Sequence, residues 1–124
     1  MAKVKINIPD KRIQELLCNA LEGGSNYWYR IKSLNYPEGQ TKETLKLVFP
    51  HLELPFVEGG SLTIEDIEGD MPNKILNKDA CLKGLQIMSE EHTRHFGDFI
   101  SEDDDAITGD VFLQCALYGE VIYG

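Results

Sequence analysis

Apolar and polar residues alternate near the beginning of the chain in the way that is typical of a half-buried β-strand. Val4, Ile6 and Ile8 are separated by polar residues, and side chains two positions apart share one face of a strand. Pro9 then interrupts the alternation. We therefore expect a strand at residues 3–8.

The apolar spacing changes to that of an amphipathic helix after Pro9. Asp10 is suited to capping its first turn, because a carboxylate accepts hydrogen bonds from free backbone N–H groups. Glycine ends helices because it takes the left-handed conformation without penalty, so Gly23-Gly24 should close this one. We expect a helix at 10–22, with its apolar stripe formed by Ile13, Leu16, Leu17, Ala20 and Leu21.

The middle of the chain favours β-structure and loops. Residues 27–34 are rich in aromatic and β-branched side chains and predict a strand, and a second strand is expected at 61–67. Residues 35–43 and 68–76 have the polar, glycine- and proline-containing composition of loops. Residues 44–57 are ambiguous, because two prolines interrupt their alternating pattern.

Helical spacing dominates the last third of the chain. It predicts helices at 78–91, where Asn77 or Asp79 can serve as the cap, and at 108–118, where Thr108 can. Phe96, Phe99 and Ile100 predict a short helix between them. The chain of 124 residues therefore predicts a single α+β domain over 1–124, with a small antiparallel β layer covered by three to four helices.

Charge is distributed unevenly along the chain, which has a formal net charge of −9. Residues 1–36 carry six basic and three acidic side chains, whereas residues 37–124 carry six basic and 18 acidic ones, with no lysine or arginine after Arg94. Binding to a nucleic-acid backbone requires lysine and arginine to displace counterions. We therefore expect no direct nucleic-acid partner. The uneven charge suggests a polarised surface that can steer association with a positively charged partner, and the alternative is that acidic loops simply keep a small domain soluble.

Other features indicate a cytoplasmic protein without a membrane segment. No apolar run approaches the roughly 20 residues needed to span a bilayer. The three cysteines, Cys18, Cys81 and Cys115, are an odd number without finger spacing, which is typical of reduced thiols in the cytoplasm.

Residues 23–30 are the densest concentration of recognition chemistry. Glycine lets backbone N–H groups approach a ligand, serine and asparagine form hydrogen bonds, aromatic rings stack, and arginine pairs with phosphate. The alternative is a helix end followed by a strand whose aromatic residues fill the core. The candidate ligand-binding residues are Gly23, Gly24, Ser25, Asn26, Tyr27, Trp28, Tyr29 and Arg30.

A run of acids near the end of the chain is the second candidate site, for a protein partner. Its alternative interpretation is a solvated loop in front of a capped helix. The candidate partner-binding residues are Asp98, Glu102, Asp103, Asp104, Asp105 and Asp110.

No motif indicates an enzyme, a cofactor or a metal site. A Walker loop, a dinucleotide fingerprint and a Gly-x-Ser-x-Gly elbow are all missing from the sequence. His92 and His95 lie three apart, but no third ligand stands at a recognised spacing. We expect no cofactor and no metal site, and we name no catalytic residue.

Several segments resemble, in the same order, a family of small, mostly uncharacterised bacteriophage and prophage proteins. They are Glu-Gly-Gly-Ser-Asn-Tyr-Trp-Tyr at 22–29, residues 82–88 and 95–99, Gly-Asp-Val-Phe-Leu-Gln at 109–114, and Tyr-Gly-Glu-Val-Ile-Tyr-Gly at 118–124. The resemblance implies a phage-borne accessory protein in a bacterial host cell.

Two functional hypotheses follow. In the first, the protein counters host defence by binding an immune effector protein stoichiometrically, with its acids imitating nucleic-acid phosphates. In the second, residues 23–30 sequester a nucleotide immune signal without turning it over: Trp28 or a tyrosine stacks on the base and Arg30 pairs with phosphate. A homodimer fits the second hypothesis, because small-molecule pockets often lie at subunit junctions.

Overall fold

The computed structural model describes residues 5–124, and a buried helix lies at the centre of its fold. This helix, α5 (Ala106–Tyr118), contacts α1 (Asp10–Asn19), α3 (Lys78–Glu91) and α4 (Thr93–Ile100). Every residue from Val111 to Leu117 is buried. An apolar helix without a polar face is stable only when neighbours cover it on all sides, which explains its central position.

Side chains that precede the two longest helices cap them. Asn77 Oδ1 accepts from the backbone N–H of Ala80 at 2.9 Å and begins α3. Asp105 Oδ1 accepts from the backbone N–H of Thr108 at 3.0 Å and begins α5. The expectation that Thr108 caps this helix is therefore wrong: Thr108 lies in the first turn and donates to the cap.

A three-stranded antiparallel sheet packs one face on the helices. Its order is β1 (Tyr29–Asn35), β2 (Ser61–Asp66), β3 (Lys74–Leu76). The alternate burial of β2 places Leu62 and Ile64 in the core. Ser61, Thr63 and Glu65 point to the opposite, outer face, because side chains alternate along a strand. This outer face is polar along β2, and the exposed Ile75 of β3 lies on it opposite Thr63.

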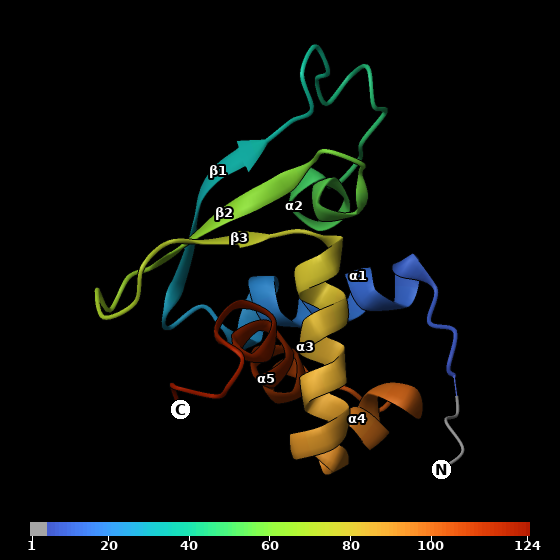
Figure 1. Ribbon diagram of the computed structural model, residues 1–124, viewed down its shortest axis with the longest axis vertical. Helices are drawn as coiled ribbons and strands as arrows, with labels where there is room; N and C mark the ends of the chain where they lie inside the picture. Colours follow the sequence, from blue (N-terminus) through green and yellow to red (C-terminus); the bar gives the residue numbers. More distant parts are fainter. Residues whose placement is uncertain (1–4) are drawn as a thin grey trace.

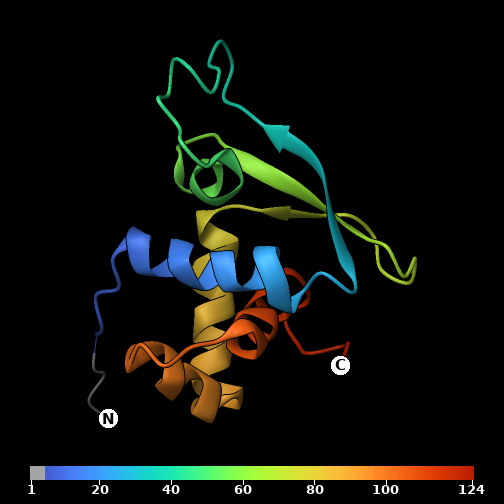
Figure 2. The same ribbon diagram turned by 180° about the vertical axis from the view of Figure 1, so that it is seen from behind.

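The sheet and α2 lie at one end of the molecule, and α1, α3, α4 and α5 lie at the other (Figure 1). Between β1 and β2 the chain extends away from the helices, then returns through α2 (Pro50–Glu53) and the short 3-10 turn η2 (Leu54–Phe56). Seen from behind, α1 passes across α3, with the sheet on one side of it and α4 and α5 on the other (Figure 2).

The structure confirms the α+β class and corrects several boundaries. The strand expected at 3–8 is wrong for residues 5–8, which have no regular secondary structure, and residues 3–4 lie outside the described part. The first helix continues past Asn19 as the π-helical turn η1 (Ala20–Gly24). The loop expected at 68–76 contains β3, which the sequence analysis missed.

The strand expected at 27–34 begins two residues later than predicted. Residues 25–28 form a turn, and the register of β1 shifts between Ile31 and Ser33. The shift brings Leu34 opposite Leu62, on the side of the sheet that faces the helices. The simple alternation of the two faces of this strand is therefore interrupted between Ile31 and Ser33.

Among the helices of residues 5–124, none is long and apolar enough to cross a membrane.

Candidate functional site

The two candidate sites of the sequence meet at one carboxylate. Asp110, on α5, accepts three hydrogen bonds from the segment at 23–30: from Ser25 Oγ at 2.8 Å, from Trp28 Nε1 at 2.7 Å and from Tyr27 OH at 2.6 Å. Ser25 and Trp28 are fully buried, so the carboxylate satisfies donors that water cannot reach. Asp110 therefore holds the 25–28 turn against α5, and this role is structural.

Trp28 belongs to the core rather than to an exposed site. Its ring stacks on Tyr123 at a centroid distance of 5.5 Å and an interplanar angle of 24°, and it lies 5.6 Å from the ring of Tyr118. Because Trp28 has no exposed surface, it cannot stack on a nucleotide base in this conformation. The assignment of Trp28 as the stacking residue is wrong.

The chain terminus closes over this aromatic cluster. Gln114, buried on α5, accepts from the backbone N–H groups of Ile122 and Tyr123 at 2.7 and 2.8 Å. The hydroxyl of Tyr123 donates to Asp66 at the end of β2. Tyr123 thus packs on Trp28 and connects the last residues to α5 and β2.

One of the two glycines of the 23–30 segment serves helix packing. A Cβ on Gly24 would lie 1.8 Å from the carbonyl oxygen of Ala106, at the start of α5, whereas a Cβ on Gly23 would have ordinary contacts. Gly24 therefore permits close approach of η1 to α5, and the hypothesis that it admits a ligand receives no support from its surroundings.

Arg30 is exposed, but it has a partner within the sheet. Its Nε and one terminal nitrogen donate to the same carboxylate oxygen of Glu65 on β2, at 3.0 and 2.6 Å. The hydroxyl of Tyr29 donates to the carbonyl of Leu21. Apart from Arg30, the exposed polar side chains of the segment are those of Asn26 and Tyr27, so its surface is small for binding a nucleotide.

The acidic candidates fall into two groups. Asp104 accepts from Arg12 at 3.0 Å and from Asn19 at 2.8 Å, which ties the loop before α5 to α1. Asp105 caps α5, and hydrogen bonds from the backbone N–H and hydroxyl of Thr108 lower its pKa. Together with Asp110, these acids have structural roles.

The remaining acids are available for a partner. Within residues 5–124, the side chains of Asp98, Glu102 and Asp103 form no salt bridge or hydrogen bond, and the latter two are exposed. They lie at the end of α4 and in the following turn, where Glu102 has a φ of 61°. We refer to these three residues as the acidic turn.

An apolar hollow adjoins the acidic turn. It has a volume of about 360 Å³ and is lined by Ile6, Ile8, Phe99, Ile100 and the stem of Arg12, with Glu102 at its border. Arg12 also lies over the ring of Phe99, 4.6 Å from its centroid. The sequence analysis missed this hollow; Ile6 and Ile8, which alternate like a strand without finding a partner strand, were its only signal.

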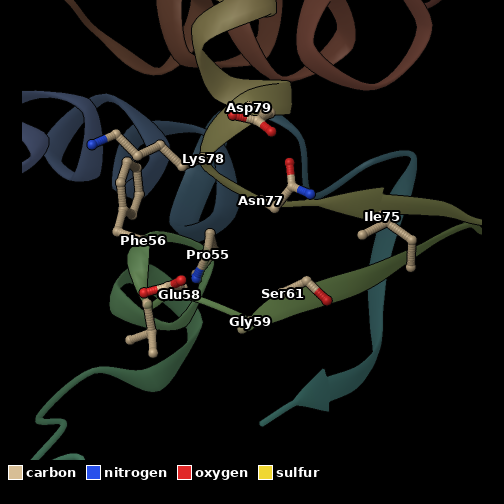
Figure 3. A pocket seen from close by; sticks show the side chains of 11 residues that line it. Pro55, Phe56, Glu58, Gly59, Ser61, Ile75, Asn77, Lys78 and Asp79 are labelled. Atoms are coloured by element: carbon tan, nitrogen blue, oxygen red, sulfur yellow. The ribbon is translucent and has the colours of Figure 1, made fainter. Parts of the chain in front are cut away.

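A groove lies between the start of β2 and the end of β3 (Figure 3). It has a volume of about 550 Å³ and is lined by residues 55–61 and by Ile75, Asn77, Lys78 and Asp79. Two carboxylates, Glu58 and Asp79, border it, and its one ammonium, Lys78, is already 3.1 Å from Asp10. The charge balance therefore disfavours an anionic ligand such as a nucleotide phosphate.

The cysteine thiols are poor nucleophiles. Burial raises the pKa of Cys81 to about 12 and that of Cys115 to about 11. Partial burial, together with the hydrogen bond from Cys18 Sγ to Glu22, raises the pKa of Cys18. Since the thiolate is the reactive form, none of the three is activated, and all three are free in the structure.

Comparison with known proteins leaves the geometry as the main guide to function. No protein-family model, curated protein or solved structure matches the chain. Among the residues that the structure describes, the acidic turn and the adjacent apolar hollow are surface features that are not used for internal packing.

Proposed function

We propose that this protein is a phage-type accessory protein that counters host bacterial defence by binding an immune effector protein in a stoichiometric, inhibitory complex. The observation that carries the proposal is the acidic turn, whose three carboxylates have no side-chain partner within residues 5–124. The order of segments that resembles phage and prophage proteins supplies the biological context. Neither observation requires a catalytic step.

The acidic turn fits a basic surface on the effector. Carboxylates without partners in the free protein keep their charge for an incoming arginine or lysine, and such complementarity accelerates and orients association. If the basic surface of the effector normally binds nucleic acid, the acids occupy the place of phosphates. The binding should then weaken with added salt, because exposed charges are screened.

A capture experiment with a charge-neutralised variant tests the proposal. The tagged protein and the variant Asp98→Asn, Glu102→Gln, Asp103→Asn are expressed in bacteria that carry a defence system, and the captured effector is then titrated in pure form. We expect the variant to bind about tenfold more weakly or worse, since several exposed charge pairs of up to ~1 kcal/mol each are lost. The effector should lose nucleic-acid binding in the wild-type complex.

A matched variant separates local charge from net charge. Glu38→Gln, Glu43→Gln, Glu58→Gln removes the same charge from exposed positions elsewhere and should bind like the wild type. The proposal is wrong if the effector binds both variants equally, or if its affinity is indifferent to salt.

A further inference from the structure

Exposed apolar side chains gather around residues 5–8. Ile6 is 56% exposed, Leu82 on α3 is 44% exposed and Ile100 on α4 is 46% exposed. Scattered apolar residues are normal on a protein surface, but a contiguous patch marks an interaction site. These three residues are contiguous because Ile6 lines two hollows, one bordered by Leu82 and the other by Ile100.

The two hollows form one feature, which we call the Ile6 seam. The first is the hollow beside the acidic turn, and the second, of about 380 Å³, lies between α3 and α4. Both share Ile6 and Ile8. The wall on α3 is formed by Leu82, Leu85, Gln86 and Ser89, which share one helix face because they are spaced at i, i+3, i+4 and i+7.

The segment that separates the hollows is held by side-chain contacts. Among the described backbone hydrogen bonds outside helices and strands, none involves residues 5–8. Ile8 is half-buried and packs on the core, whereas Ile6 projects outward. The seam therefore presents apolar side chains that no other described element covers.

The charge beside the seam specifies the kind of occupant. Glu102 borders the first hollow and Asp103 follows it in the same turn. The one basic residue lining either hollow, Arg12, is engaged by Glu15 at 2.9 Å and by Asp104 at 3.0 Å. An apolar surface with free carboxylates at its border complements a segment that carries both apolar and basic side chains.

We propose that the Ile6 seam binds a cationic amphipathic helix of the partner protein. Two adjacent hollows accept apolar side chains from successive turns of one helix face, and the acidic turn pairs with lysine or arginine at the edge of that face. This inference rests on the proposed function, because it assigns the contact chemistry of the same surface.

A model peptide tests the seam without knowledge of the partner. The probe is a synthetic helix with leucine on one face and lysine on the other, and its control carries glutamate in place of lysine. The leucine–lysine peptide should shift backbone amide signals of residues 5–9, 82–89 and 96–103 in the NMR spectrum of the full chain, and the glutamate peptide should not. Shifts confined to other residues overturn the inference.

Two pairs of exposed apolar residues, one in the seam and one near the sheet, provide matched variants. Ile6→Ser, Leu82→Ser should weaken binding of the leucine–lysine peptide about tenfold or more, because the apolar area it buries is lost. Ile67→Ser, Ile75→Ser replaces residues of similar exposure near the sheet and should change binding little. Equal weakening by both pairs means non-specific attraction to an acidic protein and overturns the inference.

Two further outcomes are distinguishable. In the first, binding of the captured effector depends on the acidic turn and yet is unchanged by Ile6→Ser, Leu82→Ser. In that case the proposed function stands and the inference about the Ile6 seam is wrong. If sedimentation shows a dimer that Ile6→Ser, Leu82→Ser dissociates, a second copy occupies the seam and the cationic helix is wrong.

Discussion

At the scale of single residues, Asp110 fixes the position of the segment at 23–30 against α5. Its carboxylate lies on the helix that forms the centre of the core, and it receives donors from three side chains of one turn. A charged acceptor strengthens each of these hydrogen bonds. The same turn that suggests a ligand site in the sequence is thereby committed to holding the fold together.

Removal of this carboxylate should destabilise the protein. We expect Asp110→Ala to lower the free energy of unfolding by about 3 kcal/mol, because the buried donors of Ser25 and Trp28 lose a charged partner. Urea titration followed by the fluorescence of Trp28, the single tryptophan, measures the change. Asp103→Ala is the control and should stay within about 0.5 kcal/mol of the wild type; equal effects would show that Asp110 has no special role.

At the scale of elements, glycines set how closely the helices pack. A Cβ on Gly84 of α3 would lie 2.8 Å from Cα, Cβ and N of Ala116 on α5. A Cβ on Gly109 of α5 would lie 2.5 Å from the backbone nitrogen of Ala20. Both contacts are too short for a carbon atom, so the helices are in contact through their backbones at these positions.

Replacing glycine by alanine should lower the stability of the protein where the glycine is tightly packed and raise it where the glycine faces open space. Gly84→Ala and Gly109→Ala should each lower the stability by roughly 1–3 kcal/mol, because overpacking displaces backbone. Gly97→Ala, in α4, meets nothing within 4 Å and should raise it by up to ~1 kcal/mol through helix propensity. Thermal and urea unfolding measure all three, and a gain in stability at Gly84 or Gly109 would contradict the packing.

Elements with long periodic patterns could be predicted from the sequence, and short ones could not. The helix at 78–91 agrees with prediction because its apolar spacing and the Asn77 cap are local signals. The three residues of β3 carry no pattern of their own, and pairing with β2 alone makes them a strand. Residues 5–8 show the converse, since their alternation has no partner strand among the described residues.

The candidate sites were harder to predict than the fold, because the role of each candidate residue depends on contacts with residues far away in the sequence. The pattern at 23–30 shows glycine, serine and aromatic residues, but only the tertiary structure brings Asp110 to Ser25 and Trp28 from 80 or more positions away. The division of the acids has the same origin: Asp104 is neutralised by Arg12, 92 positions distant. The Ile6 seam likewise combines three separate parts of the chain.

At the scale of the whole molecule, buried titratable groups limit the pH range of stability on both sides. Burial opposes ionisation of Asp66, yet hydrogen bonds from Tyr123 and from the backbone N–H groups of Glu68, Met71 and Asp70 outweigh it and lower its pKa. The donors to Asp66 come from the chain terminus and from the turn after β2. Its charge therefore connects parts of the molecule that are far apart in sequence.

The alkaline side is set by buried phenols and thiols. Burial, with the charge of Glu22 as a second cause, raises the pKa of Tyr29 to about 12. Burial, with the charge of Asp66 as a second cause, raises that of Tyr118 to the same value. Folding therefore favours the neutral forms of these residues, as it does for Cys81.

We expect a plateau of stability around neutral pH with losses at both ends. A carboxylate whose pKa is lower in the folded state binds fewer protons there, so the contribution of Asp66 is complete above its ordinary pKa of 3.8 and disappears as the pH falls through the folded value. A phenol whose pKa is raised contributes below its ordinary pKa of 10.0 and loses that contribution as the pH rises towards about 12. Urea midpoints measured across the pH range should show both limbs. In Asp66→Asn, which cannot ionise at this position, stability at neutral pH should be lower and the acid limb shallower. The alkaline limb should lose the part that the charge of Asp66 contributes through Tyr118, and should keep the part that comes from Tyr29 and Cys81. An unchanged acid limb in this variant would mean that other carboxylates, and not Asp66, control acid unfolding.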